Sequence, residues 1–336
     1  MNACFGKDFR FIFMFSLFTF TLLLLPFPKK IMPQLGYLNP GDLIAVVAPA
    51  GKILPEQVLP AIDWLEMNGF RVLPGHHLLS SDYQFAGKDK ERTADLQAAL
   101  DHPEVKAIIF ARGGYGTIRT LESISLEGFR KYPKWLVGFS DLTIFHNICV
   151  KLDTPSIHGP MLRGFLEKDG QPSESFLRLM KVLSGKKPVY QFGSQVANRP
   201  GKTNGTLAGG NLSLIYSLLG TPYDLDTDGK ILFMEDIGEY LYHIDRMIIS
   251  LRLAGKLRNL KGLIVGQFTG VKDNEEPFGK TVDEIILEAT RGYNYPISFG
   301  CPSGHGSPNF PLIFGQNCTL QTEENQTILS FEDNLA

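Results

Sequence analysis

The sequence predicts an α/β protein with an N-terminal doubly wound parallel sheet and a second α/β domain after it. The first observation behind this prediction is an alternation between Gly41 and Leu152, where short apolar runs alternate with segments of helical apolar spacing. The second is the length of 336 residues, which at roughly 150 residues per domain suggests two domains. The third is a content of 43% hydrophobic and 20% charged residues, which supplies a core and argues against disorder.

The elements of the first half can be assigned in chain order. Buried parallel strands read as uninterrupted apolar runs, and helices end near glycine or before a turn. Strands are expected at residues 42–49, 70–73, 107–111 and 135–139, and helices at residues 54–68, 89–100, 118–124 and 142–152. Because such sheets bind ligands beyond the carboxyl ends of their strands, the loops after these strands are candidate site segments.

The composition changes after about Leu166. Residues 168–203 are polar and rich in Gly, Pro and Ser, as in a connection between domains. We therefore expect an N-terminal domain at 36–166, a linker at 167–204 and a C-terminal domain at 205–336. In the last of these, helical patterns occur at 212–219 and 240–253, and strand patterns at 230–234, 262–266 and 327–331.

Charge and cysteine content exclude several classes of protein. The 33 Lys and Arg residues against 35 Asp and Glu residues give a net charge of −2, without the basic excess of a nucleic-acid binder. The four cysteines, Cys4, Cys149, Cys301 and Cys318, are widely spaced and include no C-x-x-C pair. They predict neither a disulfide framework nor a thiolate zinc site, and they suit a reduced cytoplasmic interior.

Residues 1–31 form a hydrophobic leader that is left out of the fold prediction. Its apolar run at 11–25 would span about 22 Å as a helix, short of the roughly 30 Å hydrocarbon core. The run has the length of a signal-peptide core, but Pro and Lys stand where small residues of a cleavage site would be. A short anchor, with membrane contact through 11–25, is a second interpretation. We favour a third, in which Met32 rather than Met1 is the true start.

A serine stands at a strand-to-helix turn in the first half. Ser140 follows the expected strand 135–139 and precedes the expected helix 142–152. Such a turn exposes a nucleophilic hydroxyl, and the helix N-terminus stabilises negative charge that develops nearby. The alternative is that Ser140 or Asp141 only caps the helix, and the motif alone favours the cap.

A glycine-rich loop follows the expected strand 107–111. Its residues Arg112, Gly113, Gly114 and Gly116 let backbone N–H groups approach a phosphate or an oxyanion closely. The loop lacks the G-K-[ST] ending of a phosphate-binding loop and the G-x-G-x-x-G spacing of a dinucleotide site. A simple tight turn is an equally good interpretation of this loop alone.

A histidine and an acid complete a possible catalytic set. His305 lies in a Gly- and Pro-rich loop, where a histidine is a better catalytic candidate than one on a helix face, although it could be an ordinary surface residue. Glu235 stands at the end of the expected strand 230–234, with Asp236 and Glu239 as rivals. The order Ser140, Glu235, His305 is one known arrangement of a serine triad.

Residues Asp224 to Glu235 also fit the calcium-loop formula D-x-D-x-D-G-x5-E. A calcium loop of this type leads into a helix, whereas residues 230–234 read as a strand and Gly238 interrupts any helix there. Pro222 interrupts the entering segment, and no second loop is available to pair with it. We expect no calcium site here, and no other metal.

Seven segments occur together in chain order. They are 44–51 (IAVVAPAG), 111–116 (ARGGYG), 137–141 (VGFSD), 157–160 (IHGP), 209–213 (GGNLS), 232–236 (LFMED), and Gly304-His305 followed by Pro311 and Gly315. From about Gly36 to the C-terminus the chain thereby resembles the LD-carboxypeptidases of serine peptidase family S66, which include muramoyltetrapeptide carboxypeptidases and microcin C7 immunity proteins.

The resemblance implies a fold and a site. The N-terminal domain would be flavodoxin- or glutamine-amidotransferase-like, the C-terminal domain a smaller, β-rich α/β unit, and the catalytic site would lie between them. Ser140 would be the nucleophile, Glu235 the acid and His305 the base. Backbone donors for the oxyanion would come from Asp141 and the Gly113-Gly114 pair, with Gly114 preferred.

The expected activity follows from the resemblance as well. It is removal of the terminal D-Ala from murein tetrapeptide during cell-wall recycling, without a metal or other cofactor, by a protein that is often a homodimer. Arg112, beside the oxyanion loop, could pair with the free carboxylate of such a substrate, or it could be structural. The alternatives are the same chemistry on a peptidyl-nucleotide and, from another class, a non-catalytic module that binds calcium or a small ligand.

Overall fold

The computed structural model describes residues 35–193 and 198–331. The leader 1–31, its apolar run at 11–25 and the choice between Met1 and Met32 as the start lie outside these residues. Among the described residues, no helix is long and apolar enough to cross a membrane.

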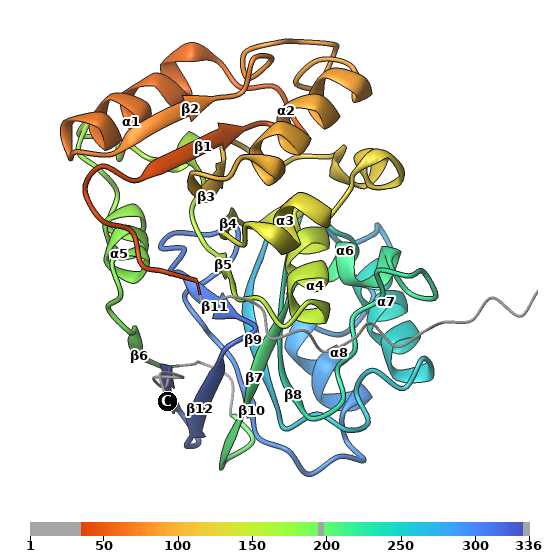
Figure 1. Cartoon of the computed structure of the whole chain (residues 1–336). Coiled ribbons are helices and arrows are strands. Elements are labelled where there is room, and N and C mark those ends of the chain that lie inside the picture. The colour runs from red at the N-terminus through yellow and green to blue at the C-terminus, as the bar shows by residue number, and fades with distance from the viewer. Residues whose placement is uncertain (1–34, 194–197, 332–336) are drawn as a thin grey trace, which may run out of the picture. The chain divides into compact units, whose positions relative to one another are not determined.

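The first sheet is the expected doubly wound parallel sheet (Figure 1). Five parallel strands run in the order β2-β1-β3-β4-β5, which is the flavodoxin order, and β11 adds an antiparallel edge beside β5. The strands are β1 (Leu43–Val47), β2 (Arg71–Pro74), β3 (Val105–Phe110), β4 (Trp135–Gly138), β5 (Ser156–His158) and β11 (Leu312–Phe314). Every residue of β1, β4 and β5 is buried, which explains why β1 and β4 read as apolar runs.

Helices and 3₁₀ turns connect these strands. They are α1 (Pro55–Met67), α2 (Asp89–Asp101), η1 (Thr117–Ser123), α3 (Glu127–Lys131), η2 (Ser140–Leu142), α4 (Thr143–Lys151) and η3 (Leu162–Gly164). Of these, α1, α2, η1 and α4 lie close to the expected helices, whereas α3 and η3 were not predicted. Pro55 occupies the first turn of α1, where its fixed φ suits the helix and its missing N–H is not needed.

The second sheet has seven strands in the order β10-β9-β8-β7-β12-β13-β6. Strands β7 to β10 are parallel, whereas β12, β13 and β6 are antiparallel. The elements are β6 (Val189–Gly193), β7 (Gly201–Asn211), α6 (Leu212–Ser217), β8 (Lys230–Ile237), α7 (Leu241–Leu253), β9 (Gly262–Thr269), α8 (Val282–Ala289), β10 (Ile297–Ser298), β12 (Asn317–Thr322) and β13 (Gln326–Phe331). The second half is thus β-rich, as the resemblance implies.

The segment 167–204 contains regular structure. It includes α5 (Glu174–Leu183), β6 and the beginning of β7. Ser173 caps α5 by accepting a hydrogen bond from the backbone N–H of Phe176, and Phe176 is fully buried. The polar composition of this segment therefore did not indicate its short amphipathic helix. The domain boundaries at 166 and 205 remain a prediction.

The two sheets are joined closely at the carboxyl ends of β4 and β7. The hydroxyl of Thr143, the first residue of α4, accepts a hydrogen bond from the backbone N–H of Asn211 at 2.9 Å. Strand β11 belongs to the second half of the chain but pairs with β5 of the first sheet. One cluster of buried apolar residues includes members of both sheets. Loops from both halves are therefore placed beside one another.

Candidate active site

Ser140 stands on the turn between β4 and α4, where the first sheet ends. Its φ of +62° is one of three positive φ values among the described non-glycine residues. Such a left-handed conformation is uncommon for serine and marks a tight, strained turn. Neither η2 nor α4 has a side-chain cap, so Ser140 and Asp141 do not serve as the helix caps that the motif alone favoured.

The Asp141 side chain points toward the neighbouring glycine-rich loop and does not cap the helix. Its Oδ2 accepts a hydrogen bond from the backbone N–H of Thr117 at 2.7 Å, and its side chain is buried. Burial raises the pKa of this carboxyl, and the hydrogen bonds of Thr117 oppose that shift. Asp141 therefore ties the turn that carries Ser140 to the glycine-rich loop.

Glu235 and His305 form a buried pair in the second half. Oε2 of Glu235 lies 2.6 Å from Nδ1 of His305, and the Glu235 side chain is fully buried while that of His305 is 13% exposed. Burial raises the pKa of Glu235, and the hydrogen bond from His305 counteracts this rise. A carboxylate on Nδ1 orients the ring and leaves Nε2 to exchange a proton.

The two rival acids have other partners. Asp236 accepts hydrogen bonds from Asn211 Nδ2 and from the backbone N–H and hydroxyl of Ser213, at 2.7–2.9 Å. Glu239 pairs with His243 one helical turn away. Glu235 Oε2 contacts His305, whereas both carboxylate oxygens of Asp236 are taken by these other groups. The structure thus brings Glu235, and neither rival, to His305.

Local backbone geometry explains how Glu235 reaches its partner. The pairing of β8 with β9 changes register between Met234 and Asp236, and such irregularities re-aim a side chain. Gly304, with φ +128°, precedes His305, and a Cβ there would lie 3.0 Å from Oε2 of Glu235. Only glycine therefore fits beside the carboxylate at this position.

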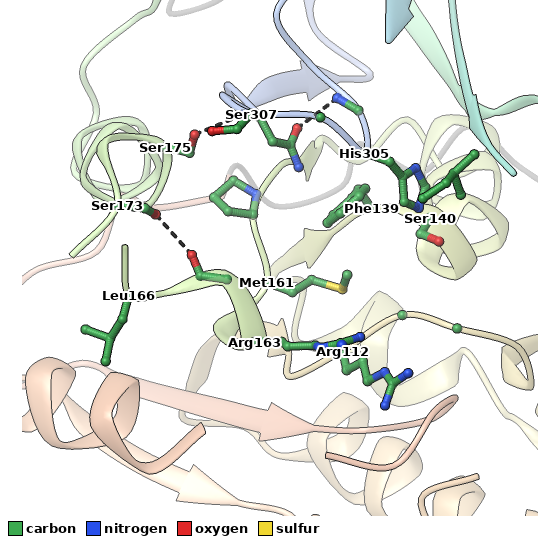
Figure 2. A pocket seen from close by; sticks show the side chains of 18 of the residues that line it. Arg112, Phe139, Ser140, Met161, Arg163, Leu166, Ser173, Ser175, His305 and Ser307 are labelled. Carbon is green, nitrogen blue, oxygen red and sulfur yellow. Dashed lines mark hydrogen bonds between the residues drawn. The ribbon is translucent and has the colours of Figure 1, made fainter. Parts of the chain in front are cut away.

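A cavity of about 590 Å³ brings together the candidates from both halves, including Ser140, His305, Arg112, Gly113 and Gly114. Figure 2 shows Ser140 and His305 at one end of this cavity, and Leu166 with Ser173 at the other. The Phe139 ring packs against His305 with centroids 4.8 Å apart. In the described part of the chain Ser140 and His305 share this cavity without a mutual hydrogen bond. Catalytic hydrogen bonds are often long before substrate binds and shorten in the complex.

The glycine-rich loop passes directly against Ser140. A Cβ on Gly113 would lie 3.2 Å from Oγ of Ser140. The carbonyl of Gly113 accepts a hydrogen bond from Gly51 N at 3.1 Å, which fixes the peptide that joins Gly113 to Gly114. In a trans peptide the N–H of Gly114 points away from that carbonyl, and Gly114 also lines the cavity. This geometry suits a fixed backbone donor near the Ser140 hydroxyl.

Arg92 supports the same loop from inside the protein and was not a sequence candidate. Its fully buried guanidinium donates to the carbonyls of Pro49, at 2.5 Å, and Gly116, at 3.1 Å. It thereby joins the loop after β1 to the loop after β3. The sequence did offer a signal for Arg92, since it lies on the buried face of the helix at 89–101. A buried guanidinium needs several hydrogen-bond acceptors, and backbone carbonyls of nearby loops can supply them.

Arg112 lines the cavity with its Nη1 donating to the Lys52 carbonyl at 2.5 Å. A second arginine, Arg163 of η3, lines the same cavity and was also missed by the sequence analysis. Its loop position after the 157–160 segment carried no distinguishing pattern.

The carboxylates of the calcium-loop formula have other partners in the structure. Asp224 and Asp226 pair with Lys256 and Lys230, at 2.9 and 3.0 Å. Glu235 lies at the far end of β8 and faces His305, because residues 230–237 form a strand. Nowhere in the described ranges do three or more His, Cys, Asp or Glu side chains gather as metal ligands would.

Comparison with known proteins identifies the family. Residues 44–159 match the LD-carboxypeptidase N-terminal domain of peptidase family S66, and residues 204–320 match its C-terminal domain. The chain is 34% identical over 295 residues to the probable murein peptide carboxypeptidase of Bacillus subtilis, covering 87% of this chain and 92% of that protein.

Solved structures agree with this assignment. The muramoyltetrapeptide carboxypeptidase of Oxalobacter formigenes superposes with a TM-score of 0.79 at 28% identity, covering 87% of this chain and 99% of that one. The microcin C7 self immunity protein MccF shares the fold, with a TM-score of 0.78 at 20% identity over 90% of this chain and 100% of its own. With both domain models matched in order, the chain belongs to the LD-carboxypeptidase family, peptidase family S66.

Proposed function

We propose that the protein is a serine carboxypeptidase that hydrolyses the L,D-peptide bond before the terminal D-Ala of murein tetrapeptide. The main observation that supports this proposal is the buried Glu235–His305 pair in the cavity that Ser140 also lines. The relatives named as murein peptide and muramoyltetrapeptide carboxypeptidases supply the substrate class. We assign Ser140 as nucleophile, His305 as general base and Glu235 as the acid that orients it.

The reaction proceeds through an acyl-enzyme. The Ser140 hydroxyl gives its proton to Nε2 of His305 as its Oγ bonds to the carbonyl carbon of the third peptide residue. His305 then gives this proton to the departing amine of D-Ala as the C–N bond breaks. Water repeats the sequence: its proton passes to His305, its oxygen bonds to the acyl carbon, and Ser140 recovers its proton as the ester bond breaks.

Negative charge on the tetrahedral intermediate needs fixed donors close to Ser140. We assign this role to the backbone N–H of Gly114, with the N–H groups of Gly113 and Asp141 as neighbouring donors. The carbonyl of Gly113 is held by Gly51, so the adjacent peptide cannot rotate freely. Losing one such donor typically costs about 10²- to 10³-fold in kcat.

Arg112 is assigned to the free carboxylate of the substrate. It lies next to the glycine pair and lines the cavity, with one guanidinium nitrogen already fixed on Lys52. The planar guanidinium can still present other N–H groups to a carboxylate.

The proposed function is tested by measuring D-Ala release from murein tetrapeptide by the purified full chain. We expect release by the wild type and a loss on the order of 10⁴- to 10⁶-fold in kcat for Ser140→Ala. Ser217→Ala, at an exposed position of α6, is the matched control and keeps wild-type activity. Activity that survives Ser140→Ala would reject this nucleophile. A folded wild type that leaves the tetrapeptide intact but cleaves a peptidyl-nucleotide would replace the substrate.

We also infer a cytoplasmic location and a homodimer. Cys149 and Cys301 are buried free thiols, which suits a reducing compartment. The dimer is expected from the family resemblance alone. Fractionation of the producing cells and light scattering of the purified protein test the two inferences separately.

A further inference from the structure

Two arginines line the candidate cavity without an acidic partner. Among the residues that the structure describes, neither Arg112 nor Arg163 has a carboxylate oxygen within 4.0 Å, although both border the cavity of Ser140. Glu167 also lines this cavity, and its carboxylate forms no ion pair with either guanidinium. The cavity therefore holds two positive charges that the fold does not neutralise.

Backbone contacts bring the two arginines together. Arg112 follows β3, and Arg163 lies on η3 after β5. The backbone N–H of Arg163 donates to the carbonyl of Ala111, the residue before Arg112, at 2.9 Å. Figure 2 shows the two side chains next to each other on one wall of the cavity. Partial burial lowers the pKa of Arg112, and the positive charge of Arg163 lowers it further, which agrees with this proximity.

Holding like charges together is unfavourable unless an anion joins them. The two side chains differ in mobility: Arg112 is partly buried and fixed on Lys52, whereas Arg163 is exposed. One guanidinium is thus preorganised, and the other can move to meet a bound group. Carboxylates match guanidinium groups because two parallel N–H···O bonds can form.

We propose that Arg163 is a specificity residue that binds, together with Arg112, the free C-terminal carboxylate of the substrate. This inference rests on the proposed function and deepens it. An enzyme that removes one residue from a chain end must distinguish a free carboxylate from the amide of a continuing chain. A carboxylate bound between the two guanidinium groups offsets the repulsion between their positive charges. A neutral amide offsets it less, so the substrate with the free carboxylate binds better.

The test compares two substrates: murein tetrapeptide with a free D-Ala carboxylate, and the same peptide ending in D-alaninamide. Release of D-Ala or D-alaninamide by the full chain gives kcat/KM for each, and their ratio measures selectivity for the carboxylate. The variants are Arg163→Gln and Arg163→Lys. Lys168→Gln is the matched control, because it removes one positive charge from the same loop at a residue that does not line the cavity.

We expect Arg163→Gln to lower the ratio about 10- to 100-fold, by slowing cleavage of the acid and leaving the amide unaffected. Arg163→Lys should recover part of the ratio, because it restores the charge without the planar pair of donors. Lys168→Gln should keep the wild-type ratio. Thermal unfolding of each variant checks that the fold persists.

An unchanged ratio in Arg163→Gln would overturn the inference. So would an equal loss on both substrates, since that pattern indicates a structural role rather than recognition of a charge. Either result leaves the proposed function intact, because the wild type still releases D-Ala. A folded wild type that cleaves neither peptide would instead reject the proposed function and this inference together.

Discussion

Glu235 and His305 are 70 positions apart in the chain, yet Oε2 of the first lies 2.6 Å from Nδ1 of the second. The contact joins the end of β8 to the loop after β10, and the carboxylate has no exposure to solvent. Its other oxygen, Oε1, has no hydrogen-bond partner within the described structure. The histidine is therefore the main polar group that balances this buried acid.

The first prediction is that Glu235→Gln lowers kcat by about 10⁴-fold while the protein still folds. An amide of the same shape on Nδ1 favours the wrong tautomer of His305 and does not stabilise its protonated form. Folding should be spared, because burial already disfavours the charge of Glu235 and raises its pKa. Steady-state kinetics and thermal unfolding of the same preparation give the two measurements.

Glu239→Gln is the matched control for this prediction. It makes the same chemical change four positions along the chain, at a carboxylate that pairs with His243. Its kcat should stay within a few-fold of wild type. If Glu239→Gln lowered kcat strongly and Glu235→Gln lowered it little, Glu235 would not be the acid of the triad.

The centre of the first sheet could be predicted because its strands are buried on both faces. Strands β1 and β4 are uninterrupted apolar runs, and their pattern is unambiguous. Three-residue strands carry too little pattern for this. Strand β5 was missed for that reason, as was β11, whose antiparallel pairing with β5 joins distant parts of the chain.

The candidate site was only partly predictable. The turn made Ser140 a candidate beside its interpretation as a helix cap. Residue positions suggested Glu235 and His305, and the resemblance supported all three. The choice between Glu235 and Asp236 depends on which face of β8 meets the loop after β10, a property of the sheet packing. Arg163 had no signal at all, because an exposed arginine in a loop looks like any solvated residue until its neighbours are known.

The second prediction concerns the close approach of the glycine-rich loop to Ser140, the proposed nucleophile. Gly113→Ala should lower kcat at least about 10²-fold, because its methyl group would lie 3.2 Å from Oγ of Ser140 and displace the hydroxyl. Gly113 has no positive φ, so the backbone itself accepts alanine. The unfolding free energy should change by less than about 1 kcal/mol.

Gly292→Ala is the comparison for the glycine loop. A Cβ there meets nothing within 4 Å, its φ is not positive and it does not line the cavity. It should keep wild-type kcat. Full activity of Gly113→Ala would show that the loop does not constrain Ser140.

The third prediction is loss of stability in mild acid through His146. Full burial lowers the pKa of this imidazole to about 4, while its nitrogens contact Ser156 Oγ and the Gly138 carbonyl at 2.8 and 3.0 Å. In the unfolded chain the pKa is about 6.5. As pH falls from about 6.5 to 4, the unfolded state therefore binds a proton that the folded state does not, and stability decreases.

Urea unfolding at pH 7, 6 and 5 measures this dependence. One such group contributes a slope of up to about 1.4 kcal/mol per pH unit. His146→Gln removes the titration and should reduce the slope relative to wild type. The buried acids Asp141 and Asp236, whose pKa values are raised, act in the opposite direction in both proteins. Equal slopes in the two proteins would contradict a neutral His146.

The fourth prediction concerns the pairing of strands β7 and β8, which places Asn211 opposite Glu235. Gly209 has φ +136°, and a Cβ there would lie 2.0 Å from the carbonyl oxygen of Phe233. The carbonyl belongs to the backbone of the buried sheet and the backbone of residue 209 fixes the position of the Cβ, so no side-chain rotation relieves the overlap. Gly209→Ala should therefore destabilise the protein by more than about 3 kcal/mol, or prevent folding.

Gly205→Ala on the same strand is the matched control, because a Cβ there makes contacts no closer than 3.4 Å and its φ is not positive. Alanine is also the better residue in a strand interior, so the control should stay within about 1 kcal/mol of wild type. The midpoints of urea unfolding of the wild type, Gly209→Ala and Gly205→Ala measure these differences in stability. Similar midpoints for Gly209→Ala and Gly205→Ala would mean that β7 can shift along β8. The alignment of Asn211 with Glu235 would then not depend on the glycine at position 209.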